Sequence, residues 1–293
     1  MENQAKANSL GSALRLLMAA LAKERAMFRS GVLGIFLSIV GLIVMGIHGP
    51  IIEPEGLLKK AISFDIALGI YVLTLLLFMP LAGFSARGLR RWRGWHVGLV
   101  LLAYCFENIQ IARGLDPRFS THGSPADQIL GGVFFLQANG LVVLFIILAV
   151  KIFRNKAPSN PLLLLAARYA FAATLIAFAA GQWMSFAGGP LTGAAGNIMA
   201  LHAMGFHGLQ AVPLIALFLS WAGESEKQGR PWVQIAGLTW FAASIVIGLQ
   251  TYLGQSLLEL SVLPLLTMAF LLVWGFIAVR SSYLWLKMAP KVL

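Results

Sequence analysis

The stretch NIMALHAMGFHGLQAVPLIALFLSW, from Asn197 to Trp221, decides how the rest of the chain is interpreted. It is long enough to cross a bilayer as a helix, since about 20 apolar residues span the hydrocarbon core. It also carries four residues that are unusual in a membrane span: His202, His207, Gln210 and Pro213. Polar side chains at this depth are costly unless they contact protein or a water-filled cavity. The segment therefore predicts a bundle in which other helices receive these side chains.

The composition of the whole chain is that of a membrane protein. Of its 293 residues, 59% are hydrophobic and 11% are charged, and the mean hydropathy is +0.81. Soluble globular chains carry about 25% charged residues. A net charge of +11 suggests nucleic-acid binding in a soluble domain, but here the basic residues lie in short loops beside apolar runs. We therefore expect contact with the lipid bilayer and none with nucleic acid.

The chain divides into a surface segment and a transmembrane domain. In residues 1–29, leucines recur at helical spacing with basic residues between them, which predicts an amphipathic helix on the membrane surface. Residues 30–293 are predicted to form an all-α polytopic bundle of about eight transmembrane helices. The apolar runs lie at residues 31–48, 64–84, 95–113, 129–152, 162–184, 197–221, 232–254 and 261–285.

Three further expectations concern the runs themselves. No internal repeat is predicted, because the similarity between residues 135–138 and 208–211 covers only four positions. The single cysteine, Cys105, lies inside an apolar run, and we expect it to be a packed, unreactive thiol. The first long apolar run follows a basic stretch and is predicted to be an uncleaved span, not a signal peptide.

The loop charges predict the orientation of the bundle. On one side lie 17 of the 22 Lys and Arg residues, including both ends of the chain. Because such residues stay in the cytoplasm, both termini are predicted to be cytoplasmic. Five of the eight tryptophans fall at the same ends of the runs, as expected for an interfacial belt.

This orientation places most of the unusual polar residues in the extracytoplasmic half. The candidates for a pocket open to that side, besides those of residues 197–221, are His48, Glu107, Gln110, Arg113, Arg118, His122, Gln137 and Gln250. Glu107 is an acid inside an apolar run and needs a partner. We expect Arg118 or a histidine of residues 197–221 to provide it; a protonated, neutral glutamate is the alternative.

The spacing of the two histidines limits what they can bind. His202 and His207 lie about 140° apart around a helix, so one metal ion cannot contact both from a single helix face. His207 and Gln210 share a face. A haem or a transition metal therefore needs His202 or His207 together with a ligand from another helix. The cofactor-binding candidates are His202, His207, Gln210 and His48, with His202 and His207 as metal ligands.

Two segments carry a resemblance. The first runs from His202 to Pro213, HAMGFHGLQAVP, and the second is ENIQIARGLDPRF, residues 107–119. Both resemble stretches of a family of bacterial inner-membrane proteins that has no assigned function. The resemblance implies a multi-pass protein of a bacterial inner membrane. The family pattern has Asp-Leu-Arg where this chain has Asn197-Ile-Met199.

The sequence leaves three functions open. The first is a redox or sensing module that binds haem or a metal ion in the pocket. The second is a carrier or receptor, proton-coupled or not, that binds a small molecule in the same pocket. The third is an accessory protein in which the polar cluster only sets helix packing. No nucleotide-binding loop, hydrolase elbow or zinc-protease motif is present, so no catalytic residue is assigned and the question of an enzyme stays open.

Overall fold

The computed structural model describes residues 24–156 and 160–288 and confirms the all-α helix bundle. Its helices are α3 (Arg25–His48), α4 (Leu58–Phe78), α5 (Ala86–Ala112), α6 (Pro125–Arg154), α7 (Pro161–Ala187), α8 (Ile198–Trp221), α9 (Glu226–Tyr252) and α10 (Val262–Met288). Seven of them are long and apolar enough to cross a membrane. The exception, α5, is of comparable length but carries more polar residues. The chain is therefore a multi-pass membrane protein in contact with lipid.

The ends of the helices differ from the predicted spans by a few residues. The predicted surface helix of residues 1–29 falls largely outside the described residues, and its last part, from Arg25, belongs to α3. The second helix begins at Leu58, six residues earlier than predicted, because the hairpin before it ends there. Cys105 is exposed on α5, so the expectation of a packed thiol is wrong.

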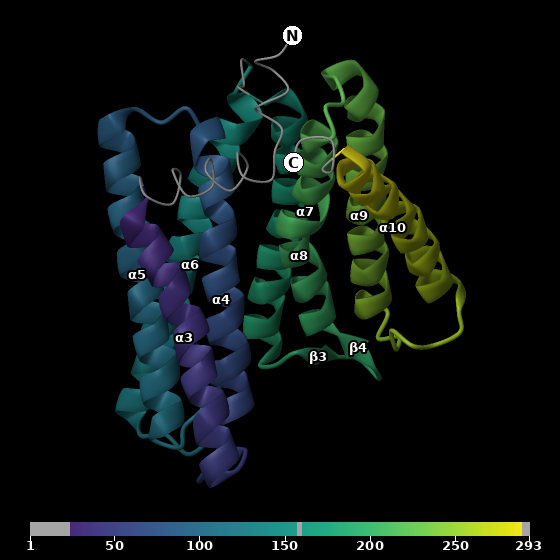
Figure 1. The fold of residues 1–293 in the computed structure, drawn as a ribbon. Coiled ribbons are helices and arrows are strands. Elements are labelled where there is room, and N and C mark those ends of the chain that lie inside the picture. Colours follow the sequence, from purple (N-terminus) through teal and green to yellow (C-terminus); the bar gives the residue numbers. More distant parts are fainter. Residues whose placement is uncertain (1–23, 157–159, 289–293) are drawn as a thin grey trace. The chain divides into compact units, whose positions relative to one another are not determined.

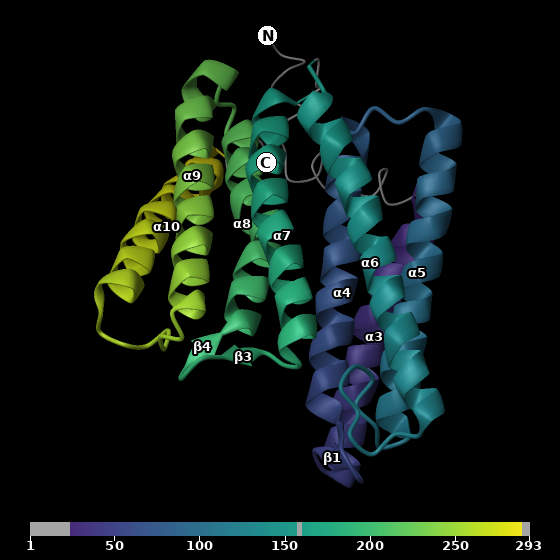
Figure 2. The same ribbon diagram turned by 180° about the vertical axis from the view of Figure 1, so that it is seen from behind.

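The contacts within the chain define two compact units, which we describe separately. The N-terminal unit contains α3, a hairpin of β1 (Ile51–Ile52) and β2 (Gly56–Leu57), α4, the short 3-10 helix η2 (Met79–Leu81), α5 and α6 (Figure 1). The C-terminal unit contains α7, a hairpin of β3 (Leu191–Thr192) and β4 (Gly196–Asn197), α8, α9 and α10 (Figure 2). Both units thus have the order helix, hairpin, three helices.

This shared order is an internal repeat, so the prediction of no repeat is wrong. The residues that shape the turns recur at a constant separation of 140 positions. Identical pairs at this separation include Gly49 and Gly189, Pro50 and Pro190, Gly56 and Gly196, Gly83 and Gly223, Ser85 and Ser225, Trp92 and Trp232, Gln110 and Gln250, and Gly114 and Gly254. The matches are one or two residues long and lie between dissimilar apolar runs, which is why the four-residue similarity noted above gives no hint of them.

The hydrogen bonds at the hairpins repeat with the same separation. In the N-terminal unit the amide of Glu55 donates to the carbonyl of Gly114 at 2.9 Å. In the C-terminal unit the amide of Ala195 donates to the carbonyl of Gly254 at 2.8 Å. Each hairpin is therefore fixed against the end of the third helix of its own unit. We call this end of each unit its hairpin end.

The helix contacts repeat as well. In the N-terminal unit, Gly34 packs against the backbone oxygen of Asp65. The equivalent positions are Thr174 and Gly205, and the Thr174 hydroxyl approaches the Gly205 carbonyl at 3.5 Å. From the first helix to the turn after the third, the two units therefore share one register, and residues 140 positions apart can be compared directly. The fourth helices, α6 and α10, begin 137 positions apart.

Local capping explains where several helices begin. The side chains of Ser85, Asn160 and Asn197 accept hydrogen bonds from backbone amides in the first turns of α5, α7 and α8. Ser225 forms a capping box with Gln228 at the start of α9. Such caps satisfy amides that have no partner inside the helix.

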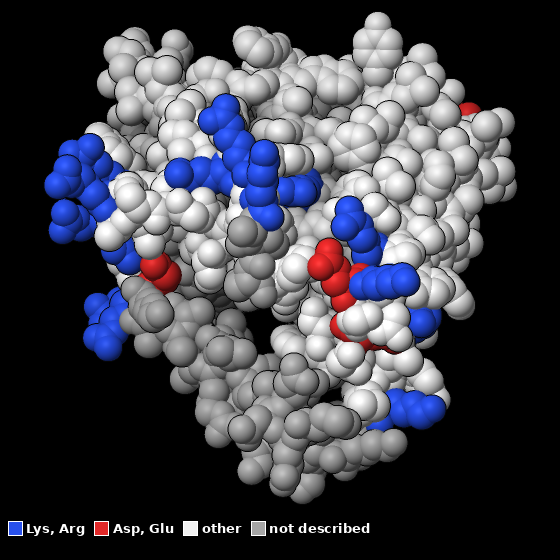
Figure 3. Space-filling view, turned by 90° about the horizontal axis from the view of Figure 1, so that it is seen from above, with Lys and Arg blue, Asp and Glu red and all other residues white. Residues whose placement is uncertain are grey.

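The two ends of the helices differ in charge. Figure 3 views the ends opposite the hairpins, where Lys and Arg side chains predominate over Asp and Glu. The basic residues at the corresponding helix ends include Arg87, Arg90, Arg91, Lys151, Arg154, Lys227, Arg230 and Lys287. Large apolar side chains are exposed along the helices between the ends, as on α10, where Leu272, Phe276 and Val279 are exposed.

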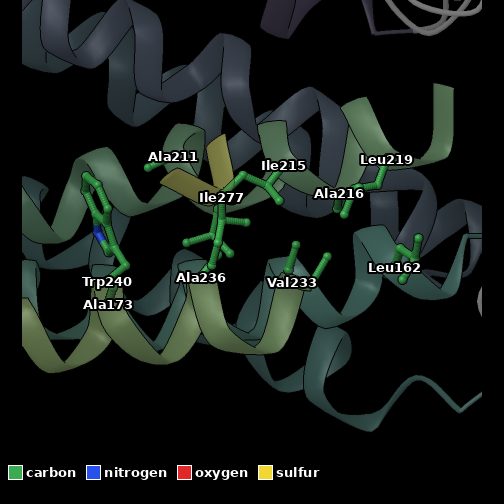
Figure 4. Close-up of a cluster of buried hydrophobic side chains, with 12 residues drawn as sticks. Leu162, Ala173, Ala211, Ile215, Ala216, Leu219, Val233, Ala236, Trp240 and Ile277 are labelled. Atoms are coloured by element: carbon green, nitrogen blue, oxygen red, sulfur yellow. The ribbon is translucent and has the colours of Figure 1, made fainter. Parts of the chain in front are cut away.

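The apolar core of the C-terminal unit lies between α7, α8, α9 and α10 (Figure 4). Its buried side chains include Leu162, Val212, Ile215, Leu219, Val233 and Ile277. Trp240 lies at the edge of this cluster and is 7% exposed. The packing leaves a groove beside Trp240, which is described below.

Candidate functional site

Comparing the two units distinguishes residues that both units share, which build the fold, from residues that occur in only one unit. The turn glycines, the helix caps and the Gln-x-x-x-Gly segments occur in both units. Two buried acids of the N-terminal unit are replaced in the other unit: Asp65 by Gly205 and Glu107 by Ile247. The same fold therefore forms without these charges, which makes them candidates for function.

Glu107 lies at the centre of the N-terminal polar cluster. Its side chain is 0% exposed, and one oxygen, Oε1, accepts a hydrogen bond from Arg118 Nη2 at 2.7 Å. The predicted pair of Glu107 with Arg118 is thereby confirmed. The other oxygen, Oε2, is buried and has no hydrogen-bond partner among the described residues. The Arg118 guanidinium packs against the rings of Phe64 and Phe134, with its carbon 5.3 Å and 5.8 Å from the ring centroids.

A second layer of contacts holds the loop that carries Arg118. Asp116 pairs with Lys60 and accepts hydrogen bonds from the amides of Arg118 and Phe119, both at 2.9 Å. Glu55, on the hairpin, accepts hydrogen bonds from the same loop and lies 3.2 Å from His122 Nδ1. The loop between α5 and α6 is thus tied to both the hairpin and α4.

These contacts keep the carboxylates of Glu55 and Asp116 charged. Burial tends to raise the pKa of Glu55, but hydrogen bonds from Ser120, Thr121 and His122 outweigh burial and hold its pKa well below the usual range. Burial likewise opposes ionisation of Asp116, and the Lys60 ammonium with two backbone amides lowers the pKa of this carboxyl. The loop is therefore an ionised network at neutral pH.

Asp65, on α4, is buried beside Glu107 and was not among the predicted site residues. It is 0% exposed, and the Asn108 amide donates to both of its oxygens, at 3.1 Å and 3.0 Å. None of the described Lys or Arg residues forms an ion pair with it. The Tyr104 hydroxyl, one turn from Asn108, is buried and makes no hydrogen bond to a described residue. Asp65 begins an apolar run in the sequence and gives no sign there of the partners that surround it.

The other predicted site residues of the N-terminal unit make contacts that do not involve Glu107 or Arg118. Gln110 and Arg113 bind Asp127 at the start of α6. Gln137 donates from Nε2 to the carbonyl of Leu99 at 2.8 Å. His48 is exposed at the end of α3. Gln110 and Arg113 therefore belong to the hairpin end, whereas Gln137 joins α6 to α5.

In the C-terminal unit, His202 and Gln250 serve the packing of helices and turns. Nδ1 of His202 lies 2.7 Å from the carbonyl oxygen of Ala177 on α7. Its ring packs against Gly181, as Ile62 packs against Gly41 at the equivalent position of the other unit. Gln250 is fully buried and donates to the carbonyl of Ser256 in the next turn. In the N-terminal unit, an apolar side chain thus makes the glycine contact that the His202 ring makes here.

His207 and Gln210 meet at a groove between α8, α9 and α10. The groove has a volume of about 300 Å³ and is lined by His207, Gln210, Ala211, Leu214, Ile215, Phe218, Trp240, Trp274 and Ala278. The predicted shared face of His207 and Gln210 is confirmed, since both side chains line one cavity. His207 is nine residues from the start of α8, about 14 Å along the helix axis. No Lys, Arg, Asp or Glu lines the groove.

The two tryptophans of the groove present their rings and not their N–H groups. Nε1 of Trp240 donates to the carbonyl of Met204 at 3.2 Å, and Nε1 of Trp274 donates to the carbonyl of Ala211 at 3.3 Å. The rings meet edge to face with centroids 4.9 Å apart. Hydrogen bonding to a bound molecule therefore falls to the side chains of His207 and Gln210.

The two predicted haem or metal ligands of α8, His202 and His207, lie on different sides of the helix, as their spacing predicts. The remaining histidines belong to the N-terminal unit. Within residues 24–156 and 160–288, no group of three His, Cys, Asp or Glu side chains is arranged to hold a metal ion. His207 is exposed and hydrogen-bonds to none of the described residues, so of the two predicted ligands on α8 its ring is the more accessible.

Comparisons of the chain with protein-family models, with curated protein sequences and with solved structures found no match. The internal repeat is therefore the available guide to which residues matter. By that guide, His207, Gln210 and Trp240 are distinctive, since the other unit has Ala67, Ile70 and Val100 in their places.

Proposed function

We propose that this membrane protein binds a neutral, flat, lipid-soluble molecule in the groove of its C-terminal unit and acts as a carrier or receptor for it. The proposal depends on one observation: His207 and Gln210 both line the wall of an otherwise apolar groove. The side chains of histidine and glutamine each offer hydrogen-bond donors, which suits a carbonyl or hydroxyl group. The absence of charged lining residues favours an uncharged ligand, and the tryptophan rings favour a planar one.

A quinone has the required chemistry. It is a planar ring with hydrogen-bond-accepting carbonyl groups, and it dissolves in the hydrocarbon that surrounds the middle of α8. Binding of this kind agrees with a redox or sensing role as well as with transport, so the proposal covers two of the roles that the sequence leaves open. A haem or metal ion at His207 requires a second ligand from elsewhere, and the groove has no further histidine.

Single substitutions on the two faces of α8 test the proposal. We expect His207→Ala to abolish binding of a short-chain 1,4-benzoquinone, measured by quenching of tryptophan fluorescence in the purified protein. Gln210→Ala should weaken binding by about 0.5–1.5 kcal/mol, the contribution of one hydrogen bond. His202→Ala is the matched control on the α7-facing side: it should lower the melting temperature and leave quinone binding unchanged, because its ring bonds to Ala177.

The opposite outcome separates packing from binding. If His207→Ala lowers the melting temperature and the quenching curve does not change, the groove is a packing defect and the proposal fails. Absorbance and metal content of the same preparations report whether His207 holds haem or a metal ion, because either signal then disappears in His207→Ala and persists in His202→Ala.

We also propose that the protein lies in a bacterial inner membrane with both chain ends in the cytoplasm. The Lys and Arg residues at the helix ends opposite the hairpins support this orientation. Among the described residues each unit has four long helices, so both hairpin ends should face the extracytoplasmic side.

Reporter fusions test this topology. We predict that reporters placed after Leu293, near Gly88 or near Gly229 read as cytoplasmic, and that insertions near Gly123 or Gly193 read as extracytoplasmic. A cytoplasmic reading at Gly123 contradicts the assignment, since that residue lies in the loop at the hairpin end of the N-terminal unit.

A further inference from the structure

Asp65 is a carboxyl group in a position where a charge has little to stabilise it. It is 0% exposed in α4, seven residues from the start of that helix. The Asn108 amide donates to Asp65 but carries no charge. Arg118 pairs with Glu107 and not with Asp65. A buried carboxylate without a cation is costly, and protonation is the simplest way to remove the cost.

Two unpartnered groups lie beside it. Glu107 Oε2 is buried and has no hydrogen bond to a described residue, and the same is true of the Tyr104 hydroxyl. The Tyr104 hydroxyl and the backbone oxygen of Asp65 both lie against Gly34 of α3, and Glu107 directly precedes Asn108, which donates to the Asp65 carboxylate. Tyr104, Glu107 and Asn108 lie on one face of α5, so the helix presents a row of polar groups to α4. These groups can accept or pass a proton without rearrangement of the backbone.

The other groups that face this cluster are accounted for. The loop contributes Arg118 and Asp116, and α4 contributes Lys60, which pairs with Asp116. Asp127 on α6 is occupied by Arg113. The buried residues of α3 are Met27, Ser30, Gly31, Gly34 and Ser38, which carry no titratable group. Arg118 is 34% exposed and connects the buried pair with solvent at the hairpin end.

The C-terminal unit shows that the fold does not need these groups. The positions equivalent to Asp65, Tyr104, Glu107 and Asn108 are Gly205, Ser244, Ile247 and Gly248. There, Gly205 packs closely against Ala173 and Ala177 of α7, and none of the four equivalent residues is an acid. A packing role alone is thus met in this protein by small and apolar residues.

We propose that Asp65 and Glu107 form a proton-binding site in the N-terminal unit, in which Asp65 holds the proton and Glu107 with Arg118 connects it to water at the hairpin end. On acidification a proton moves from bulk water to the Asp65 carboxylate, giving a neutral carboxylic acid. On alkalinisation it returns to water by the same route. The site is distinct from the groove of the C-terminal unit and does not depend on the function proposed for it.

Infrared difference spectroscopy on the full-length protein in lipid vesicles tests this site. We expect a pH step to reveal the carbonyl stretch of a protonated carboxyl group, and we expect that band to be lost in Asp65→Asn. In Glu107→Gln the band should remain but respond to the pH step several-fold more slowly, because the connection to water is impaired. Glu226→Gln is the control, since Glu226 is an exposed carboxylate of the C-terminal unit, and it should leave the band unchanged.

Isotope labelling makes the result independent of the variants. The chain has three aspartates, Asp65, Asp116 and Asp127, and the last two are ion-paired. Labelling aspartate carboxyls with carbon-13 should therefore shift the band in the wild-type protein even if Asp65→Asn fails to fold. The proposal is overturned if no protonated-carboxyl band occurs at any pH at which the protein is folded, if the label leaves the band in place, or if Glu107→Gln removes it and Asp65→Asn does not. None of these outcomes affects quinone binding at His207, which is measured separately.

Discussion

Arg118→Met is expected to lower the free energy of unfolding by about 3–5 kcal/mol, the usual cost of removing one partner from a buried ion pair. The cost arises because Glu107 is 0% exposed and loses its cation, while its second oxygen already has no partner among the described residues. Glu107→Gln should cost less, about 1–3 kcal/mol, since Arg118 remains 34% exposed to water and can still donate to the new amide oxygen. Denaturant unfolding of the purified protein measures both values.

Two further variants make this prediction specific. Arg230→Met is the matched control, because the Arg230–Glu226 pair spans 3.5 Å and both side chains are more than half exposed; it should change stability by less than about 0.5 kcal/mol. The double variant Arg118→Met with Glu107→Gln should be more stable than Arg118→Met alone, because it removes the orphaned charge. Equal effects of Arg118→Met and Arg230→Met would show that the Glu107 pair contributes no more than a surface contact.

The second large effect is expected at the turn glycine of the N-terminal unit. Gly114 has φ = +76°, and a Cβ at this position would overlap the carbonyl oxygen of Glu53 on the hairpin. Gly114→Ala should therefore cost more than about 2 kcal/mol, since the left-handed conformation alone costs about 1–2 kcal/mol for a residue with a side chain. The melting temperature in detergent reports the loss.

The repeat supplies a graded comparison for this substitution. Gly254 has φ = +69°, but a Cβ there would lie 3.1 Å from the Ala194 amide, a contact that a small shift can relieve. Gly254→Ala should cost about 1–2 kcal/mol, from the conformation alone. Gly46, inside α3, has no neighbour within 4 Å of an added Cβ, so Gly46→Ala should be neutral or stabilising. A neutral Gly114→Ala would mean that the hairpin and the end of α5 separate at little cost.

Some features of the protein follow from the sequence alone. Long apolar runs fix the helices, because the hydrocarbon core admits a spanning segment only if its backbone hydrogen bonds are satisfied internally. Helical periodicity places His207 and Gln210 on one face. The need of a buried acid for a cation points to Arg118 as the partner of Glu107, and the structure confirms it. Each of these conclusions depends on local chemistry or on spacing within one segment.

Other features depended on the tertiary structure because they join residues that are far apart in the sequence. The repeat becomes visible only in the packing of Gly56 against Gly114 and of Gly196 against the end of α9. In the sequence, glycines among dissimilar apolar residues carry no detectable pattern. The buried position of Asp65 is set by α4 and α5 together. His202 and His207 look alike in the sequence, and only the packing of α7 on one side of α8 and of α9 and α10 on the other gives one a backbone partner and the other a groove. Helix periodicity separates the two faces of α8, but which neighbour covers each face is decided by long-range contacts.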